Sequence, residues 1–313
     1  MSEANRTFTI GTRGSALALW QANRFREFVG APNEIKIIKT SGDKLLDIPL
    51  QGKLEKGFFT KEIEERLISK EIDFAVHSLK DLPTETPEGL AVGACLERAE
   101  VEDLLIVKKE HIKEGGALPL KSGCKVGAGS LRRQALIRLY APDVKAELIR
   151  GNVPTRIGKL RGGFYDAMLM AKAALVRLGI KLNEFEVYEL NREYWLPAPA
   201  QGAVAIEARS EDQEAMAVLS EINHKETEVA VNIERRLLAN FEGGCHTAFG
   251  AYARREGDRW RVTLGLQNEA GKWLQTEIFG SPEECSALGI ADLSRLKELN
   301  PKDVGEICRK ILL

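Results

Sequence analysis

The stretch from Phe74 to Pro83 reads FAVHSLKDLP and predicts a buried strand that ends in a polar turn. Its first residues form the short apolar run typical of a strand inside a parallel sheet, and its final proline restricts the backbone. In such sheets ligands bind beyond the carboxyl ends of the strands, so Ser78, Lys80 and Asp81 are candidate site residues. Asp81 is the only carboxylate in this cluster, where polar and cationic groups would hold it ionised. A salt bridge with Lys80, or a place in a turn, is the commoner role of a surface aspartate.

The residues before this stretch predict the start of an α/β lobe. We expect strands over residues 7–10 and 34–40, a helix after Ser15, and a second helix over residues 60–69. Ser15 is a typical N-cap and lies with Arg13 at a strand-to-helix turn, where free backbone N–H groups favour an anion. The basic and aromatic loop that ends at Phe59 could close over a ligand or be an ordinary surface loop.

A second α/β lobe begins at about residue 96. We expect strands over residues 104–107, 125–127, 147–149 and 167–171, with helices over 131–140 and 173–178. Ser130 caps the first of these helices, and Arg132 and Arg133 occupy its first turn. Because cations there oppose the helix dipole, the pair indicates a bound anion.

Further arginines accompany this pair at the ends of predicted elements. The set that could line one crevice is Arg13, Arg132, Arg133, Arg150, Arg156 and Arg177. Arginine binds carboxylates in bidentate fashion and keeps its charge, so the ligand should carry several carboxylates or phosphates. The chain has neither a P-loop motif nor a dinucleotide-binding glycine motif, so neither kind of nucleotide site is supported.

The third region carries a thiol on a glycine loop. Residues 194–202 are rich in proline and cross back to a strand over 203–207, and two helices then lead to the loop EGGCH at 242–246. Two glycines before Cys245 leave its thiol accessible, although a lone cysteine is more often a small buried hydrophobe. The alternating residues that follow predict a three-stranded antiparallel sheet and then a helical end.

Composition limits the function classes. The 313 residues include 45 basic and 46 acidic side chains, so no overall field draws the protein to nucleic acid or to a membrane surface. Five scattered cysteines without Cys-x-x-Cys spacing argue against a disulfide framework and against a metal site such as zinc. No apolar run approaches the ~20 residues of a membrane span. We expect a cytoplasmic monomer that binds no metal, no nucleic acid and no membrane.

Six motifs occur in an order and spacing that resemble the porphobilinogen deaminase family. They are TRGS at 12–15, HSLKD at 77–81, SLRRQ at 130–134, RGN with TR at 150–156, QGAV at 201–204 and EGGC at 242–245. The resemblance implies an α/β fold of three domains, with two doubly wound lobes like type II periplasmic binding proteins and a small α+β C-terminal domain. The implied domains are residues 1–96 with 198–215, residues 97–197 and residues 216–313.

The resemblance also implies an activity and a cofactor. The family joins four molecules of porphobilinogen head to tail with loss of ammonia, and water then frees hydroxymethylbilane. A dipyrromethane cofactor would be held by a thioether on Cys245, and Asp81 would be catalytic. The resemblance assigns cofactor binding to Ser78, Lys80, Asp81, Ser130, Arg132, Arg133, Arg150 and Gly151, and substrate binding to Arg13, Ser15, Phe59, Arg150, Arg156, Arg177 and Gln201.

Two rival functions remain at this stage. A non-catalytic, two-lobed polycarboxylate-binding protein would suit the same arginines, but it needs no thiol loop. A cysteine hydrolase would pair Cys245 with His77 or His246, and its thiol should be free at rest.

Overall fold

The computed structural model describes residues 6–44, 60–241 and 248–313, which divide into two compact units. Unit 1 comprises residues 1–99 and 202–228, and unit 2 comprises residues 100–201 and 229–313. Phe59, Cys245 and His246 lie outside the described residues. The three predicted domains, with their boundaries, stay a prediction.

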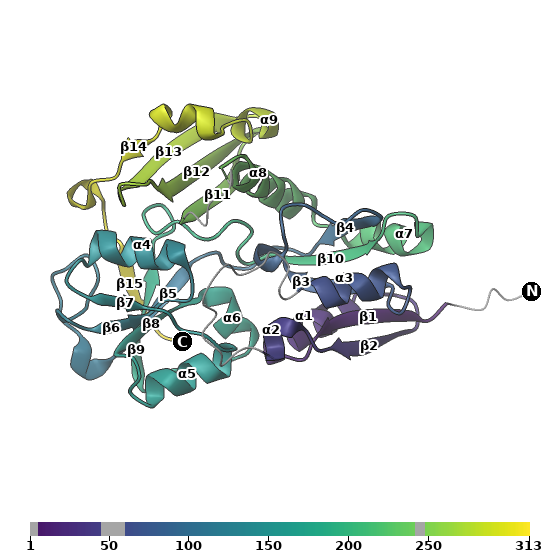
Figure 1. Cartoon of the computed structure of the whole chain (residues 1–313), viewed down its shortest axis with the longest axis horizontal. Coiled ribbons are helices and arrows are strands. Elements are labelled where there is room, and N and C mark those ends of the chain that lie inside the picture. The colour runs from purple at the N-terminus through teal and green to yellow at the C-terminus, as the bar shows by residue number, and fades with distance from the viewer. Residues whose placement is uncertain (1–5, 45–59, 242–247) are drawn as a thin grey trace, which may run out of the picture. The chain divides into compact units, whose positions relative to one another are not determined.

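Unit 1 is built on one five-stranded mixed sheet in the order β2-β1-β3-β10-β4 (Figure 1). Its strands are β1 (Phe8–Arg13), β2 (Asn33–Ile38), β3 (Phe74–Ser78), β4 (Leu90–Cys95) and β10 (Val204–Arg209), and its helices are α1 (Ala16–Arg26), α2 (Ser41–Lys44), α3 (Lys61–Ile68), the 3-10 turn η1 (Leu79–Asp81) and α7 (Gln213–Ile222). β1 is parallel to β2 and β3, whereas β10 runs antiparallel to both β3 and β4. The chain therefore returns from unit 2 to complete this sheet.

Strand β3 is buried on both faces, as its apolar sequence predicts. Phe74 packs on one face with Phe8 and Phe25, at ring-centroid distances of 5.0 and 5.1 Å. Ala75 points to the opposite face and joins a second apolar cluster that includes Leu67. Successive side chains of a strand alternate between faces, so both layers hold β3 in place.

A cluster of charged side chains lies where β3 begins and β10 ends. Arg209 pairs with Asp73 at 3.0 Å and with Asp212 at 2.7 Å. Arg6 pairs with Asp212 at 2.8 Å, with Glu214 at 3.0 Å, and also with Asp73. We call Arg6, Asp73, Arg209 and Asp212 the unit 1 cluster, and its two arginines are matched by two aspartates.

Unit 2 contains a six-stranded mixed sheet in the order β15-β9-β5-β8-β6-β7. Its strands are β5 (Asp103–Lys108), β6 (Lys125–Gly127), β7 (Lys145–Glu147), β8 (Ala167–Ala171), β9 (Phe185–Leu190) and β15 (Cys308–Ile311), and its helical segments are η2 (Lys109–His111), α4 (Leu131–Tyr140), α5 (Val153–Arg161) and α6 (Lys172–Arg177). β8, β6 and β7 are parallel, whereas β5 runs antiparallel to β8 and β9. The predicted helical end of the chain is wrong in part, because residues 308–311 instead pair with β9.

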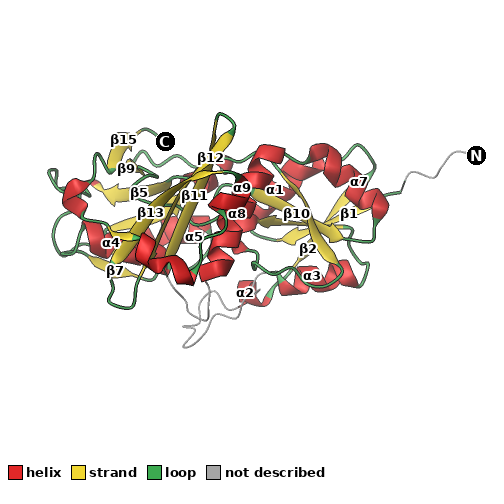
Figure 2. Cartoon of the chain, turned by 90° about the horizontal axis from the view of Figure 1, so that it is seen from above, coloured by secondary structure: helices red, strands yellow, loops and turns green. Residues whose placement is uncertain are grey.

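A second, antiparallel sheet lies in the same unit, in the order β11-β12-β13-β14. Its strands are β11 (Phe249–Glu256), β12 (Arg259–Gln267), β13 (Trp273–Gly280) and β14 (Lys297–Glu298), and the helical segments around it are α8 (Lys225–Phe241), α9 (Pro282–Cys285), η3 (Ile290–Arg295) and η4 (Pro301–Asp303). Figure 2 shows the helix α8 and the strands of this sheet. Ile233 and Leu237 of α8 share an apolar cluster with Val262 and Leu264 of β12. The three long strands predicted from the sequence are confirmed, as is the α/β fold with an additional α+β part.

Candidate functional site

The carboxyl edge of the unit 1 sheet carries the first group of predicted site residues. β1 and β3 are parallel neighbours, so Arg13 and Ser78 end strands at the same edge. Ser15 caps α1, where its Oγ accepts a hydrogen bond from the Ala18 backbone N–H at 3.3 Å. The strand-to-helix turn is therefore formed as the sequence predicts.

The turn after β3 presents Lys80 and Asp81. Leu79 and Leu82 are buried on either side of these two residues, which are exposed. The backbone N–H of Leu79 donates to the Ala203 carbonyl at 3.1 Å, and that of Leu82 donates to the Leu79 carbonyl at 3.2 Å. The two buried leucines and these hydrogen bonds hold the turn in place. The exposed carboxylate of Asp81 therefore lies on a fixed backbone at the end of β3.

Gln21, which the sequence did not point to, contacts one of the predicted site residues. It is 2% exposed, and its Nε2 donates to Ser78 Oγ at 2.8 Å. This bond orients the serine that ends β3. The available signal was a long polar side chain on the inward face of the helix that Ser15 caps.

Three buried titratable side chains lie on or next to β3: His77, Glu64 and Glu207. Nε2 of His77 is 3.1 Å from Oε2 of Glu207 on β10, and neither atom has a hydrogen-bond partner among the described residues. Burial raises the pKa of Glu64, and the charge of Glu207 raises it further, against a hydrogen bond from Thr60 and the charge of His77. His77 is therefore enclosed in the core of unit 1, which does not favour it as the exposed base of a hydrolase.

Unit 2 gathers a second group of predicted residues around Asp103, which is fully buried. Arg132 Nη2 donates to Asp103 Oδ2 at 2.9 Å, while Nε and Nη2 of Arg133 donate to its two oxygens at 3.0 and 2.6 Å. The indole N–H of Trp195 and the amide of Gln201 donate to the same carboxylate at 3.1 and 2.9 Å. We call Asp103, Arg132 and Arg133 the unit 2 cluster. The anion predicted beside the arginine pair is thus partly supplied by the protein.

The unit 2 cluster keeps a surplus of positive charge. Burial alone would raise the pKa of Asp103, but Arg133, Arg132 and the Gln201 hydrogen bond hold it well below its usual value. Two guanidinium groups against one ionised carboxylate leave one positive charge among these three side chains. Nε of Arg132 is buried and has no hydrogen-bond partner among the described residues. A buried donor of this kind calls for an acceptor.

The side chain of Arg156, a residue of α5, is held by the loop that precedes this helix. Its Nε donates to the Gly151 carbonyl at 2.6 Å, and Gly151 has a φ of +111° that favours glycine. A Cβ at Gly129 would lie 2.9 Å from Nη1 of Arg156, so this glycine leaves room for the guanidinium. Asn152 caps the helix through a bond from the Thr155 backbone N–H at 3.1 Å.

The remaining predicted residues differ in their surroundings. Arg150 is half-buried just before Gly151, and Ser130 caps α4 by accepting from the Arg133 backbone N–H at 3.3 Å. Arg177 lies in the last turn of α6, where burial lowers its pKa and Glu100 opposes that shift. Gln201 is fully buried against Asp103, so its contacts within the protein are those of a support for the cluster.

Comparison with known proteins identifies relatives over most of the chain. A family model described as "Porphobilinogen deaminase, dipyromethane cofactor binding domain" matches residues 8–217. The chain is 45% identical to a probable porphobilinogen deaminase of Methanocaldococcus jannaschii, over 78% of this chain and 82% of the relative. It is 41% identical to porphobilinogen deaminase of Geotalea uraniireducens, over 92% and 90% of the two chains. It is 40% identical to that of Maridesulfovibrio salexigens, over 96% and 97%.

Similarity to solved structures is more distant. The amino acid ABC transporter substrate-binding protein AbpA from Streptococcus pneumoniae, bound to L-arginine, has a TM-score of 0.38 and 12% identity, covering 71% of this chain and 89% of that one. A likeness at this level carries no argument about ligand or activity. The family model and the relatives, which span nearly the whole chain, do identify it: the chain belongs to the porphobilinogen deaminase family.

Proposed function

We propose that this protein joins four porphobilinogen molecules head to tail, with loss of four ammonia, on a dipyrromethane primer and then releases hydroxymethylbilane by hydrolysis. The observation that carries the proposal is the unit 2 cluster, which leaves a buried positive charge and an Nε on Arg132 without a hydrogen-bond partner in the described parts of the chain. Each pyrrole of such a chain carries an acetate and a propionate, and a carboxylate is the group that this surplus would bind.

The cofactor would be attached to Cys245, and each unit carries residues that the sequence assigns to cofactor binding. In unit 2, Arg132 and Arg133 would bind its carboxylates, with Ser130, Arg150 and Gly151 beside them. In unit 1 the corresponding groups are Ser78 and Lys80. When bound, the dipyrromethane supplies the primer from which the product chain grows. Within the residues that the structure describes, the free Nε of Arg132 and the excess positive charge of the cluster fit a ligand rich in carboxylates.

Asp81 would act on the reacting pyrroles. Loss of ammonia from porphobilinogen leaves a positive charge, and a fixed carboxylate near the pyrrole N–H groups stabilises it. The same group can move protons onto the leaving amine and off the attacked carbon. Its exposure on the anchored η1 turn supports this role. Arg13, Ser15, Arg156 and Arg177 would bind substrate carboxylates, Gln201 would serve the same site through Asp103, and Phe59 would stack on a pyrrole ring.

The proposed setting is that of a cytoplasmic monomer whose partner is a small molecule. Among the described residues, no helix is both long and apolar enough to cross a membrane. The near balance of 45 basic and 46 acidic residues supports a local anion site and no general attraction to nucleic acid.

The first test is the intact mass of the denatured protein beside that of Cys245→Ala, both made in cells that supply porphobilinogen. We expect the wild-type protein to exceed the mass of its bare chain by two linked pyrrole units and the variant to match its own chain. A wild-type mass equal to the bare chain would leave Cys245 unloaded, and the polycarboxylate-binding function would then be preferred.

The second test is Asp81→Asn. Because the amide keeps the shape and loses the charge, turnover should fall by roughly 10²- to 10⁴-fold, the usual contribution of a positioned acid or base. The mass excess from the cofactor should persist. The matched control is Glu85→Gln, an exposed carboxylate on the same loop, which should turn over normally. Near-normal turnover by Asp81→Asn would remove this residue from the mechanism.

A further inference from the structure

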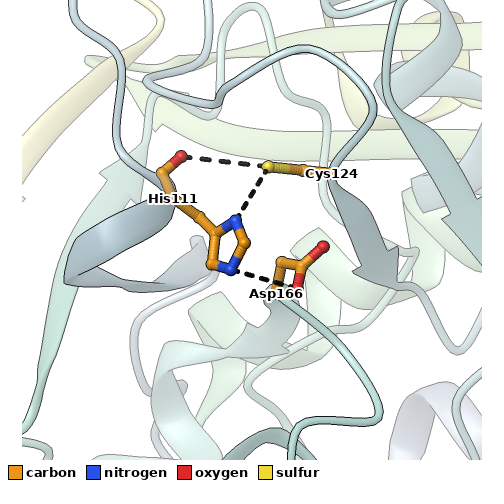
Figure 3. A group of neighbouring side chains, drawn as sticks. All are labelled: His111, Cys124 and Asp166. Atoms are coloured by element: carbon orange, nitrogen blue, oxygen red, sulfur yellow. Dashed lines mark hydrogen bonds and ion pairs between the residues drawn. The ribbon is translucent and has the colours of Figure 1, made fainter.

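Three side chains from separate segments of unit 2 converge at one point, and none of them is assigned to cofactor or substrate. His111 ends η2, Cys124 precedes β6 and Asp166 precedes β8 (Figure 3). Sγ of Cys124 is 3.7 Å from Nδ1 of His111, and Nε2 of His111 is 3.3 Å from Oδ1 of Asp166. One ligand atom from each residue lies within 4.8 Å of the others.

Backbone contacts hold each of these residues in place. Oδ2 of Asp166 accepts from the Lys125 backbone N–H at 2.8 Å, which leaves Oδ1 turned toward His111. The Cys124 carbonyl accepts from the Lys145 N–H at 2.8 Å, and the His111 carbonyl accepts from the Lys121 N–H at 3.0 Å. Outer contacts of this kind orient metal ligands before the metal arrives.

The donor set suits a divalent transition metal. Sulfur, imidazole nitrogen and carboxylate oxygen together are typical ligands of Zn²⁺, whereas Mg²⁺ and Ca²⁺ prefer oxygen alone. In a tetrahedral zinc site the S···N distance between ligands is about 3.5 Å, given bond lengths of about 2.3 and 2.0 Å. The observed 3.7 Å between Cys124 and His111 is close to that value. One ring nitrogen of His111 already lies within 4.8 Å of both other ligand atoms, and these atoms would draw closer together around an ion.

Charge and exposure agree with this assignment. Cys124 is 3% exposed, while the side chains of His111 and Asp166 are 32% and 23% exposed, so one side of the group opens to solvent. Binding would release the thiol proton to solvent, and the resulting thiolate with the carboxylate would balance a charge of two on the ion. We propose that His111, Cys124 and Asp166 form a three-ligand site for Zn²⁺ or a similar ion, with a fourth position open to water.

The alternative use of the same geometry is a Cys-His-Asp nucleophile. Burial raises the pKa of Cys124, and the charge of Asp166 raises it further. A reactive cysteine needs the opposite, a thiolate favoured by a cationic and accessible setting. The sequence predicted no metal site because the ligands are spread from residue 111 to residue 166, without a short spacing that a motif could reveal.

Cobalt binding to the chelator-treated holoenzyme tests the site. We expect one Co²⁺ per chain and a thiolate-to-cobalt charge-transfer band in the near ultraviolet, displaced by Zn²⁺. The band should be absent from Cys124→Ser and from His111→Gln, which alters a half-exposed side chain and should fold even if the buried cysteine variant does not. Asp166→Asn keeps an oxygen for the Lys125 N–H, and its affinity should fall by at least about tenfold.

Cys308→Ser is the matched control, since Cys308 lies outside the group and contacts the Ala117 carbonyl. It should retain the cobalt band. No band in the wild-type protein, or a band that survives in His111→Gln, would overturn the proposal. The metal-site proposal can fail independently of the proposed function, because Cys124→Ser and His111→Gln should keep the cofactor mass excess and normal turnover.

Discussion

Each unit has an arginine–aspartate cluster, and the two clusters differ in charge balance. The unit 1 cluster matches two arginines with two aspartates, and the exposed Glu214 adds a further carboxylate. The unit 2 cluster sets two arginines against Asp103 alone. Both arginines of the second cluster are buried, so the surplus charge is not relieved by water.

The difference distinguishes a cluster whose charges are matched within the protein from the cluster that we propose to bind ligand. Arginines of both clusters join protein segments through backbone carbonyls. Arg209 donates to those of Leu67 and Ile72, at 2.9 and 2.6 Å. Arg132 and Arg133 donate to those of Leu196 and Leu169, at 2.6 and 3.3 Å. The unit 1 cluster lies at the edge of the sheet where β3 begins, opposite the edge that carries Asp81. The number of arginines is the same in both clusters, and the excess positive charge distinguishes the one that we propose to bind ligand.

The largest effect should come from Asp103→Asn, which leaves two buried guanidinium groups without a counter-charge. Removing one partner of a buried ion pair costs about 3–5 kcal/mol of unfolding free energy. The measurement is urea unfolding in a Cys245→Ala background, so that no cofactor compensates. Asp73→Asn in the same background is the control, and it should cost only about 1–3 kcal/mol because Asp212 still pairs with both arginines. If the two variants lost equal amounts of unfolding free energy, the proposed difference in charge balance between the clusters would be wrong.

The next largest effect should come from Arg132→Met, which should lower kcat/KM strongly and the unfolding free energy only moderately. The substitution removes the surplus charge and leaves Arg133 paired with Asp103, so the unfolding free energy should fall less than in Asp103→Asn. Loss of a buried charge contact to the ligand should lower kcat/KM by roughly 10²-fold or more, equivalent to at least about 2.7 kcal/mol. A variant with wild-type kcat/KM would show that the surplus charge serves no ligand.

The smallest of the expected effects is a loss of unfolding free energy at low pH, through the aspartates of both clusters. The pKa of Asp212 is held well below its usual value by Arg6 and Arg209 against burial, as is that of Asp103 by its arginines. A carboxyl with a depressed folded-state pKa contributes stability above the unfolded value of about 3.9 and loses it as pH falls toward the folded value. Unfolding free energy should therefore decline below about pH 4, and less steeply in Asp212→Asn. The control is Glu211→Gln, at an exposed position, whose unfolding free energy should depend on pH as in the wild type. If Asp212→Asn also kept the wild-type pH dependence, Asp212 would not be coupled to Arg6.

The parts of the fold and site that depend on neighbouring residues were predictable from the sequence. Ser15 and Ser130 cap helices through bonds to residues three positions ahead, so their roles are visible in a short window. The turn at Asp81 was predictable because a strand and its polar end are contiguous. The arginine pair was recognised as needing an anion for the same local reason.

Long-range partners were not predictable in this way. Asp103 lies 29 and 30 residues before the arginines that it pairs with, at the start of a strand whose next four residues are apolar. No periodicity links these positions, so the sequence could not show that the protein supplies part of the anion. β15 was expected to be helical because its pairing with β9, more than 100 residues away, overrides local propensity.

The place of β10 between β3 and β4 has a consequence for the newly made chain on the ribosome. β4 ends at Cys95 and β10 begins at Val204, so at the usual 5–20 residues per second the missing middle strand arrives roughly 5–20 s later. During that interval β3 and β4 have unpaired edges toward the place that β10 will fill, and such edges invite wrong pairing. Early-emerging strands of this protein therefore depend on a partner that has yet to be translated, which makes the nascent first lobe a natural client for chaperones.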